Sequence, residues 1–156
     1  PMLPVMYNNN YQFVQTKSYV LILAEMAHDA RIIRIDGSEH RPDMNKWMGD
    51  SVGRWDGDTL VVETLGFNPQ QTFRGASENL KVTERFSRVS EAEVLYSFTV
   101  EDPTVFAAPW TGELMFNARP AHESMYEYAC HEGNYALSGI LAGARELERQ
   151  AAEENP

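Results

Sequence analysis

The sequence predicts a mainly β protein, a curved antiparallel sheet or barrel that is lipocalin-like in outline and carries one C-terminal α-helix. Three observations support this fold class. Strand-forming residues dominate positions 11–117, two segments there alternate apolar and polar residues, and from Asn134 onward the apolar residues recur with a helical period. We therefore expect about seven strands followed by one helix.

The clearest strands are residues 80–87 and 93–101. In the first, Leu80, Val82 and Phe86 alternate with polar residues, and in the second the alternate positions 94 to 100 are apolar. This period of two is typical of a strand with one buried face. The short connection 89–92 suits a hairpin, so we predict an antiparallel pair.

The other predicted strands are weaker or are bounded by turn residues. They are residues 19–24, 31–35, 59–64 and 113–117. Segment 19–24 is continuously apolar, which predicts a strand covered on both faces. Residues 37–50 form the longest predicted loop, and Trp55 to Asp58 read as a tight turn.

The C-terminal segment has the spacing of an amphipathic helix. Its apolar positions are Leu137, Ile140, Leu141, Ala144 and Leu147. Asn134 is the predicted N-cap, and the charged segment 145–156 is expected to fray. We expect residues 1–156 to form a single domain, from a chain that is processed or truncated before Pro1.

Charge and composition exclude several classes of partner. The net charge is −10 and the pI is about 4.8. Nucleic-acid binding requires a basic face, so no nucleic acid is expected as a partner. No apolar run is long enough to span a bilayer, so we expect no membrane insertion. A single cysteine rules out an internal disulfide.

Glu84 is the most informative charged residue of the predicted sheet. It shares the inward face of its strand with Leu80, Val82 and Phe86. A carboxylate among apolar neighbours needs a partner or a proton, and Arg31 or His28 could supply the partner. One interpretation is a ligand-binding or acid/base group inside a barrel. The other is an edge position or a purely structural ion pair.

Residues 25–31 join two predicted strands and carry further candidates. A turn there places Glu25, His28 and Asp29 at one rim of the sheet, where a rigid scaffold commonly holds binding groups. A histidine beside a carboxylate is the pairing used for acid/base catalysis, with His28 as base and Asp29 as orienting group. A solvated turn explains the same residues.

The segment 126–135 concentrates reactive side chains just before the helix. Tyr128 and Tyr135 are candidate ligand-binding residues, and His131 and Glu132 are a second candidate base and orienting carboxylate. Cys130 and His131 make a poor catalytic dyad because adjacent residues in an extended chain point apart. Cys130 is better explained as a small buried hydrophobe.

Motifs for a metal or a nucleotide are absent from the sequence. There is no HExxH, no paired cysteine, no GxGxxG and no P-loop. We therefore expect no metal site and no cofactor, although ligands from distant residues stay open. His40 and His122 lie in predicted loops and are expected to be solvated.

Several segments taken together resemble a family of uncharacterised exported bacterial proteins. They are YNNNYQ at 7–12, EMAHDAR at 25–31, WMGDS with GRW at 47–55, DTLVVET at 58–64 and YACHEGNY at 128–135. The resemblance covers nearly the whole chain and brings no assigned activity. It implies export to the periplasm or the extracellular space, and it transfers no catalytic residue.

Two functional hypotheses follow from the sequence. The first is a barrel domain that binds a small organic ligand, with or without cofactor-independent acid/base chemistry of a lyase, isomerase or hydrolase. The second is a non-catalytic binding or assembly subunit that docks a partner protein or glycan, and an oligomer is compatible with it. The inward charge of Glu84 favours the first, because such a charge costs stability.

Overall fold

The structure is a computed structural model that describes residues 2–3, 9–41, 43, 45–70, 73–129 and 131–154. The chain separates into two compact units, Pro1–Tyr126 and Glu127–Pro156. We call them the barrel unit and the helical unit and describe each by itself. Whether residues 1–156 behave as one domain stays a prediction.

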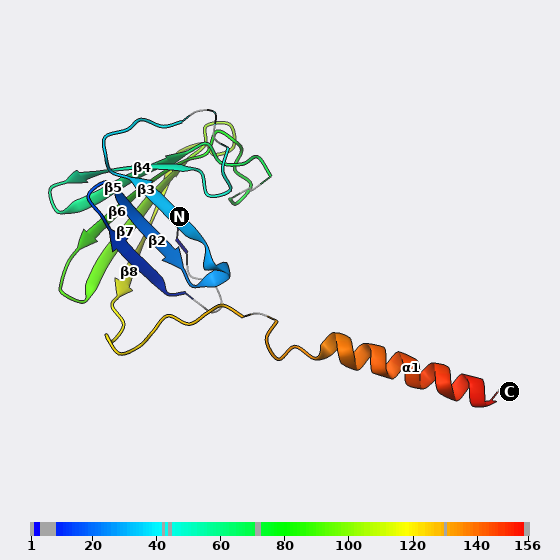
Figure 1. The fold of residues 1–156 in the computed structure, drawn as a ribbon. Helices are drawn as coiled ribbons and strands as arrows, with labels where there is room; N and C mark the ends of the chain where they lie inside the picture. The colour runs from blue at the N-terminus through cyan, green and yellow to red at the C-terminus, as the bar shows by residue number, and fades with distance from the viewer. Residues whose placement is uncertain are drawn as a thin grey trace. The chain divides into compact units, whose positions relative to one another are not determined.

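The barrel unit contains one sheet of eight strands that follow one another in chain order and curl into a half-barrel (Figure 1). The strands are β1 (Tyr11–Gln15), β2 (Tyr19–Ala24), β3 (Ala30–Arg34), β4 (Asp50–Asp56), β5 (Thr59–Leu65), β6 (Lys81–Arg88), β7 (Glu93–Glu101) and β8 (Trp110–Asn117). A short 3-10 helix, η1 (Met26–His28), connects β2 and β3. The predicted mainly β fold with one C-terminal helix is confirmed.

The sheet consists of two antiparallel meanders, β1–β3 and β4–β8. They join through a short parallel pairing of β3 with β4, in which Ile33 faces Ser51 and Arg34 faces Val52. Every other neighbouring pair is antiparallel. The predicted hairpin is β6–β7, with Glu84 opposite Phe98 and Phe86 opposite Tyr96.

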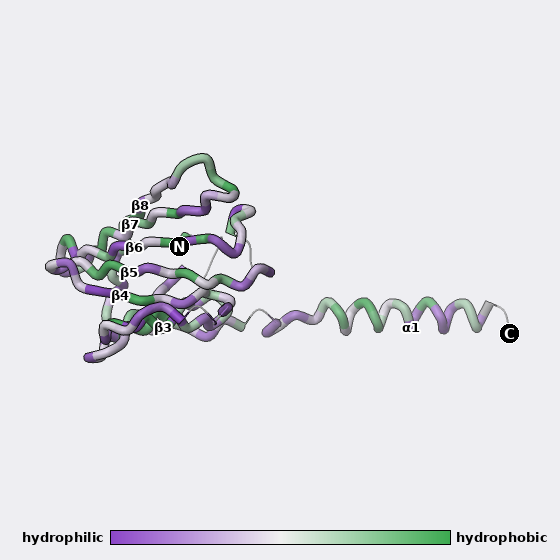
Figure 2. The backbone as a smooth tube through the Cα atoms, turned by 90° about the horizontal axis from the view of Figure 1, so that it is seen from above, coloured by the Kyte–Doolittle hydropathy of each residue, from purple (hydrophilic) through white to green (hydrophobic). Residues whose placement is uncertain are grey.

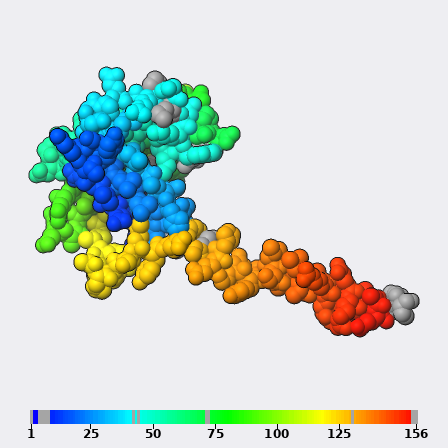
Figure 3. Space-filling model, viewed as in Figure 1, coloured from blue at the N-terminus to red at the C-terminus, as the bar shows by residue number. Residues whose placement is uncertain are grey.

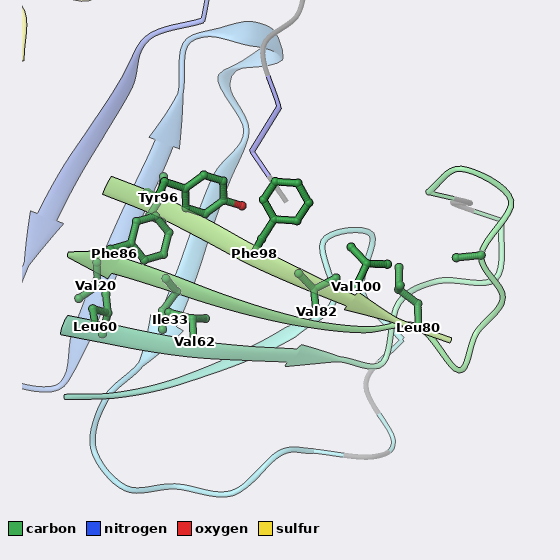
Figure 4. Close-up of a cluster of buried hydrophobic side chains, with 12 residues drawn as sticks. Val20, Ile33, Leu60, Val62, Leu80, Val82, Phe86, Tyr96, Phe98 and Val100 are labelled. Atoms are coloured by element: carbon green, nitrogen blue, oxygen red, sulfur yellow. The ribbon is translucent and has the colours of Figure 1, made fainter. Parts of the chain in front are cut away.

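The apolar core lies on the concave face of the sheet. Figure 4 shows side chains from β2, β3, β5, β6 and β7 that gather on this face, as the period-two pattern predicts. Tyr96 is central to it: its ring lies 5.0 Å from that of Phe86, 5.6 Å from that of Phe98 and 5.1 Å from that of Phe116. Such aromatic pairs stabilise a core by about 0.5–1.5 kcal/mol each beyond the area they bury.

Two sequence predictions about strands need correction. Segment 19–24 is not covered on both faces, because Val20 and Ile22 are buried whereas Leu21 and Leu23 are half-buried. Strand β4 is not predicted by the sequence. Its first residue, Asp50, falls in the predicted loop 37–50, and its last two, Trp55 and Asp56, fall in the predicted turn 55–58. Its Gly53 permits close packing: an added Cβ would lie 2.9 Å from Cγ2 of Ile33.

Strand β8 is longer than the predicted 113–117. It begins at Trp110 and contains Gly112, a residue that weakens strand signals in a sequence. A Cβ at Gly112 would lie 2.5 Å from the ring of Phe98. The ring therefore covers the glycine backbone and compensates for the missing side chain. The space-filling view shows the N-terminal strands, coloured blue, at the surface of the barrel unit (Figure 3).

The helical unit contains α1 (Ala136–Glu154). Asn134 Oδ1 accepts a hydrogen bond from the Ala136 N–H at 3.1 Å, which supports the predicted cap. Arg149 pairs with Glu146 and Glu153 on the polar face, and Figure 2 shows hydrophobic and hydrophilic positions alternating along the helix. The helix includes residues 145–154, for which fraying in solution stays a prediction.

Asp102 fastens the loop between β5 and β6 to the end of β7. Its buried carboxylate accepts hydrogen bonds from Ser77 N (2.6 Å), Ser77 Oγ (2.8 Å), Thr104 N (3.0 Å) and Thr104 Oγ1 (2.6 Å). Burial alone would raise the pKa of this carboxyl, but these bonds hold it at about 2, below the ordinary 3.8. The same loop carries Phe67 and Phe73 to the concave face.

We predict that Asp102 contributes to acid sensitivity. A depressed folded-state pKa gives stability that is complete above 3.8 and is lost as the pH falls through about 2. The free energy of unfolding of the native chain should therefore fall across this window, and that of Asp102→Asn should fall less. Urea unfolding at a series of pH values measures both. Asp58→Asn, in an exposed turn, is the control, and parallel curves for the native chain and Asp102→Asn would contradict the assignment.

Candidate functional site

A buried polar cluster lies on the concave face of the barrel unit. Glu84 from β6 is fully buried and Arg31 from β3 is 8% exposed. Arg31 Nη1 donates to Glu84 Oε1 at 3.0 Å, and Arg31 Nη2 donates to Glu84 Oε2. The predicted pairing of these two residues is confirmed.

Hydroxyl groups from three other strands complete the cluster. Tyr96 Oη donates to Glu84 Oε1 at 2.7 Å. Arg31 Nε donates to Ser51 Oγ at 2.9 Å, and Arg31 Nη2 donates to Thr64 Oγ1 at 2.7 Å. Ser51 and Thr64 share a further hydrogen bond of 3.0 Å. Five strands of both meanders thus converge on one ion pair.

Both members of the pair are held in their charged forms. Burial by itself would raise the pKa of Glu84 and lower that of Arg31. The charge and hydrogen bonds of the partner outweigh burial, so the pKa of Glu84 lies below its ordinary value and that of Arg31 above it. Glu84 therefore holds no proton at neutral pH and is poorly suited to act as a general acid.

A cavity of about 150 Å³ adjoins the cluster. Apolar side chains form most of its wall, Arg31, Thr64 and Glu84 bring the polar cluster to it, and Asp29 adds a further carboxylate. The remaining lining residues are Met2, Tyr11, Ile22, Ala24, Met48, Phe67, Phe73, Leu80 and Val82. A mainly apolar wall with a few polar groups on one side is typical of a small-molecule site.

The predicted rim residues have different surroundings. Asp29 lines the cavity, whereas His28 is exposed in η1. Ala27 and His28 both have positive φ, 58° and 55°, a conformation that costs energy for residues other than glycine. Glu25 is buried and accepts a hydrogen bond from Asn10 Nδ2 at 2.6 Å. Glu25 thus ties the residue before β1 to the start of η1.

The other predicted site residues belong to the helical unit. His131, Glu132 and Tyr135 are exposed there, and Tyr128 is half-buried. The Glu132 N–H donates to Ala129 O at 3.0 Å, which makes this segment a turn before α1. Their place at the mouth of a barrel pocket stays a prediction. Cys130 lies outside the described residues.

A second polar cluster lies on the other face of β3 and β4. Arg34 donates to both carboxylate oxygens of the buried Asp50, at 2.7 and 2.9 Å. This pairing, with a bond from the Arg41 N–H, lowers the pKa of Asp50. His40, expected to be solvated, is 22% exposed and lies 3.3 Å from Asp50 and 3.3 Å from Glu63. The cluster fastens the loop before β4.

Three residues of the inner cluster escaped sequence reasoning. Tyr96 carried a usable signal, because it shares the inward face of β7 with Phe98 and Val100 and faces the strand of Glu84. Ser51 gave no signal, since β4 was not predicted. Thr64 is the last residue of a predicted strand. Its inward hydroxyl has a role only because it accepts a hydrogen bond from Arg31, a residue distant in sequence.

We predict that the two charges of the ion pair are strongly coupled in stability. Glu84→Leu or Arg31→Met alone leaves one buried charge without its partner, which costs about 3–5 kcal/mol. The double variant removes both charges and should cost clearly less than the sum of the single changes. Denaturant unfolding of the four proteins gives the coupling energy. Strictly additive effects would show that the pair does not act as a unit.

Among the described residues, no group of three or more His, Cys, Asp and Glu side chains is placed to hold a metal ion. Within the same residues, no helix is long and apolar enough to cross a membrane. Comparison with protein-family models, curated proteins and solved structures finds no match for the chain.

Proposed function

We propose that the barrel unit binds a small, mainly apolar organic molecule in the cavity on its concave face. The observation that carries this proposal is the wall of that cavity, in which aromatic and aliphatic side chains surround one buried polar cluster. A space of about 150 Å³ suits a molecule about the size of benzene, which an apolar cavity of that volume binds in another protein. The polar side would orient such a ligand.

If the barrel unit catalyses a reaction, its acid/base groups are the rim residues His28 and Asp29 and not Glu84. Glu84 is held as a carboxylate by Arg31 and by Tyr96, so it is the less suitable proton donor. Asp29 is the carboxylate that lines the cavity outside the buried ion pair, and His28 precedes it. If a reaction occurs, these two residues are the acid/base candidates that lie in the barrel unit.

Ligand binding should be measurable without knowing the natural ligand. We predict that small aromatic or aliphatic compounds raise the melting temperature of the native chain, by an amount that grows with concentration. A ligand at 100 times its Kd stabilises a protein by about 2.7 kcal/mol. Ala24→Phe, which fills the cavity, should abolish this shift, and a thermal-shift screen with NMR titration measures it.

The matched control is Ala30→Phe, at an exposed position of β3. This variant should respond to the compounds as the native chain does. An equal response from Ala24→Phe would place binding elsewhere and would contradict the proposal.

An assembly role is the second candidate, favoured by the surface of α1. Leu137, Ile140, Ala144, Leu147 and Ala151 repeat at alternating steps of three and four residues, the spacing of a coiled-coil seam. Leu137, Ile140 and Leu147 are each 68–69% exposed. The spacing points to a second copy of the same helix as the partner, since most helical stability in proteins comes from packing of an apolar face.

This second candidate predicts a dimer that depends on the seam. Replacement of Leu137, Ile140 and Leu147 by Gln should shift the dimer toward monomer by at least tenfold in dissociation constant. Light scattering after size exclusion measures the shift over a range of concentrations. A triple change on the polar face, at Glu146, Arg149 and Glu153 to Gln, serves as control. A native chain that is monomeric at high concentration would rule out self-association through α1.

A further inference from the structure

The concave face already holds a short piece of the chain. The Met2 N–H donates to Tyr96 Oη at 2.8 Å. Met2 lines the cavity, and Met2 and Leu3 pack against the buried core cluster. The chain thus places a backbone amide and an apolar side chain beside the cavity. A ligand with the same two groups could take their place.

Glu84 fixes which partner donates and which accepts in the hydrogen bonds around Tyr96. Arg31 donates to Glu84, and Glu84 as a carboxylate can only accept. Tyr96 has one hydroxyl proton and gives it to Glu84 Oε1 at 2.7 Å. Tyr96 Oη therefore has only acceptor lone pairs left, and one of them receives the N–H of Met2, which lines the cavity. Any ligand that took the place of Met2 would have to offer a donor to this oxygen.

Several features keep this polarity fixed. Burial, and then the charge of Glu84, raise the pKa of Tyr96, so the phenol stays protonated at every physiological pH. Tyr96 is fully buried, and its ring is held among Phe86, Phe98 and Phe116. A hydroxyl that donates to a carboxylate is also polarised into a better acceptor. The site is therefore preorganised to receive an N–H group.

We propose that the cavity binds secondary amides with a short apolar chain, such as hydrophobic peptide segments, and recognises their N–H through Tyr96 Oη. Residues 2–3 occupy this position in the structure and would compete with an added ligand. The inference rests on the proposed function, because it names the ligand class of the same cavity. It excludes apolar molecules that offer only acceptor groups as preferred ligands.

Three small probes separate the N–H from the rest of the ligand. N-methylhexanamide carries the N–H, whereas N,N-dimethylhexanamide and methyl hexanoate have similar chains without it. We expect the secondary amide to bind the native chain at least tenfold more tightly than either of the others. The ester is the most apolar of the three, so hydrophobicity alone predicts the opposite order. NMR titration gives the three dissociation constants.

Two variants test the proposed partner atoms. Tyr96→Phe should abolish the preference for the secondary amide while the ester still binds, and Tyr19→Phe, which removes an exposed hydroxyl from β2, should change nothing. Met2→Gly with Leu3→Gly should strengthen amide binding about tenfold, because the competing segment loses its packing. The comparison of the three probes on the native chain needs no variant, so it stands even where Tyr96→Phe fails to fold.

The outcomes distinguish the two levels of the proposal. If all three probes bind equally, or if Tyr96→Phe keeps the same preference, amide recognition is overturned while the ligand-binding cavity survives. If none of the probes binds and none of the apolar compounds shifts the melting temperature, the proposed function itself fails. Unchanged amide affinity after the Met2 and Leu3 substitutions would overturn the competition by residues 2–3.

Discussion

The buried ion pair between Arg31 and Glu84 is the interaction on which the rest of the barrel unit depends. Arg31 belongs to the first meander, and Glu84, Ser51, Thr64 and Tyr96 belong to the second. The backbone ladder between the two meanders is the short parallel pairing of β3 and β4. Side-chain bonds therefore supplement the sheet where its backbone pairing is shortest. Replacing such a pair by well-packed apolar residues can be neutral or even stabilising, so its advantage here is positional specificity.

A buried arginine–carboxylate pair lies on each face of the sheet where β3 pairs with β4. On the concave face Arg31 donates hydrogen bonds to Thr64 of β5 and Glu84 of β6. On the other face Arg34 donates to Asp50, the first residue of β4. An arginine presents a planar fork of donors that matches a carboxylate in two directions. Two such forks, three residues apart on β3, fix the register of β4 from both sides. The register in turn decides which residues of β4 face the cavity.

Sequence reasoning recovered what local patterns encode. Alternation along residues 80–87 and 93–101 gave the central hairpin, the inward face of Glu84 and its need for a partner. It missed β4, because the strand holds Asp50, Ser51 and Gly53, whose value depends on side chains contributed by β3 and β5. Tyr96 was visible as an inward residue but not as a hydrogen-bonding group, since its role follows from the register with Glu84. Pairwise geometry between distant segments is the information that a single sequence lacks.

The order of the strands also bears on how the barrel unit forms. Antiparallel neighbours that are adjacent in the chain need only short loops to close, so each meander has mostly local contacts. The parallel joint is different, because the whole segment from Ile35 to Gly49 must be closed before β3 and β4 can meet. Its ladder is short, and the Arg31–Glu84 pair can form only once β3 has met the second meander. We therefore expect the two meanders, β1–β3 and β4–β8, to form first and to dock late in folding. The ion pair between Arg31 and Glu84 then holds them together in one register.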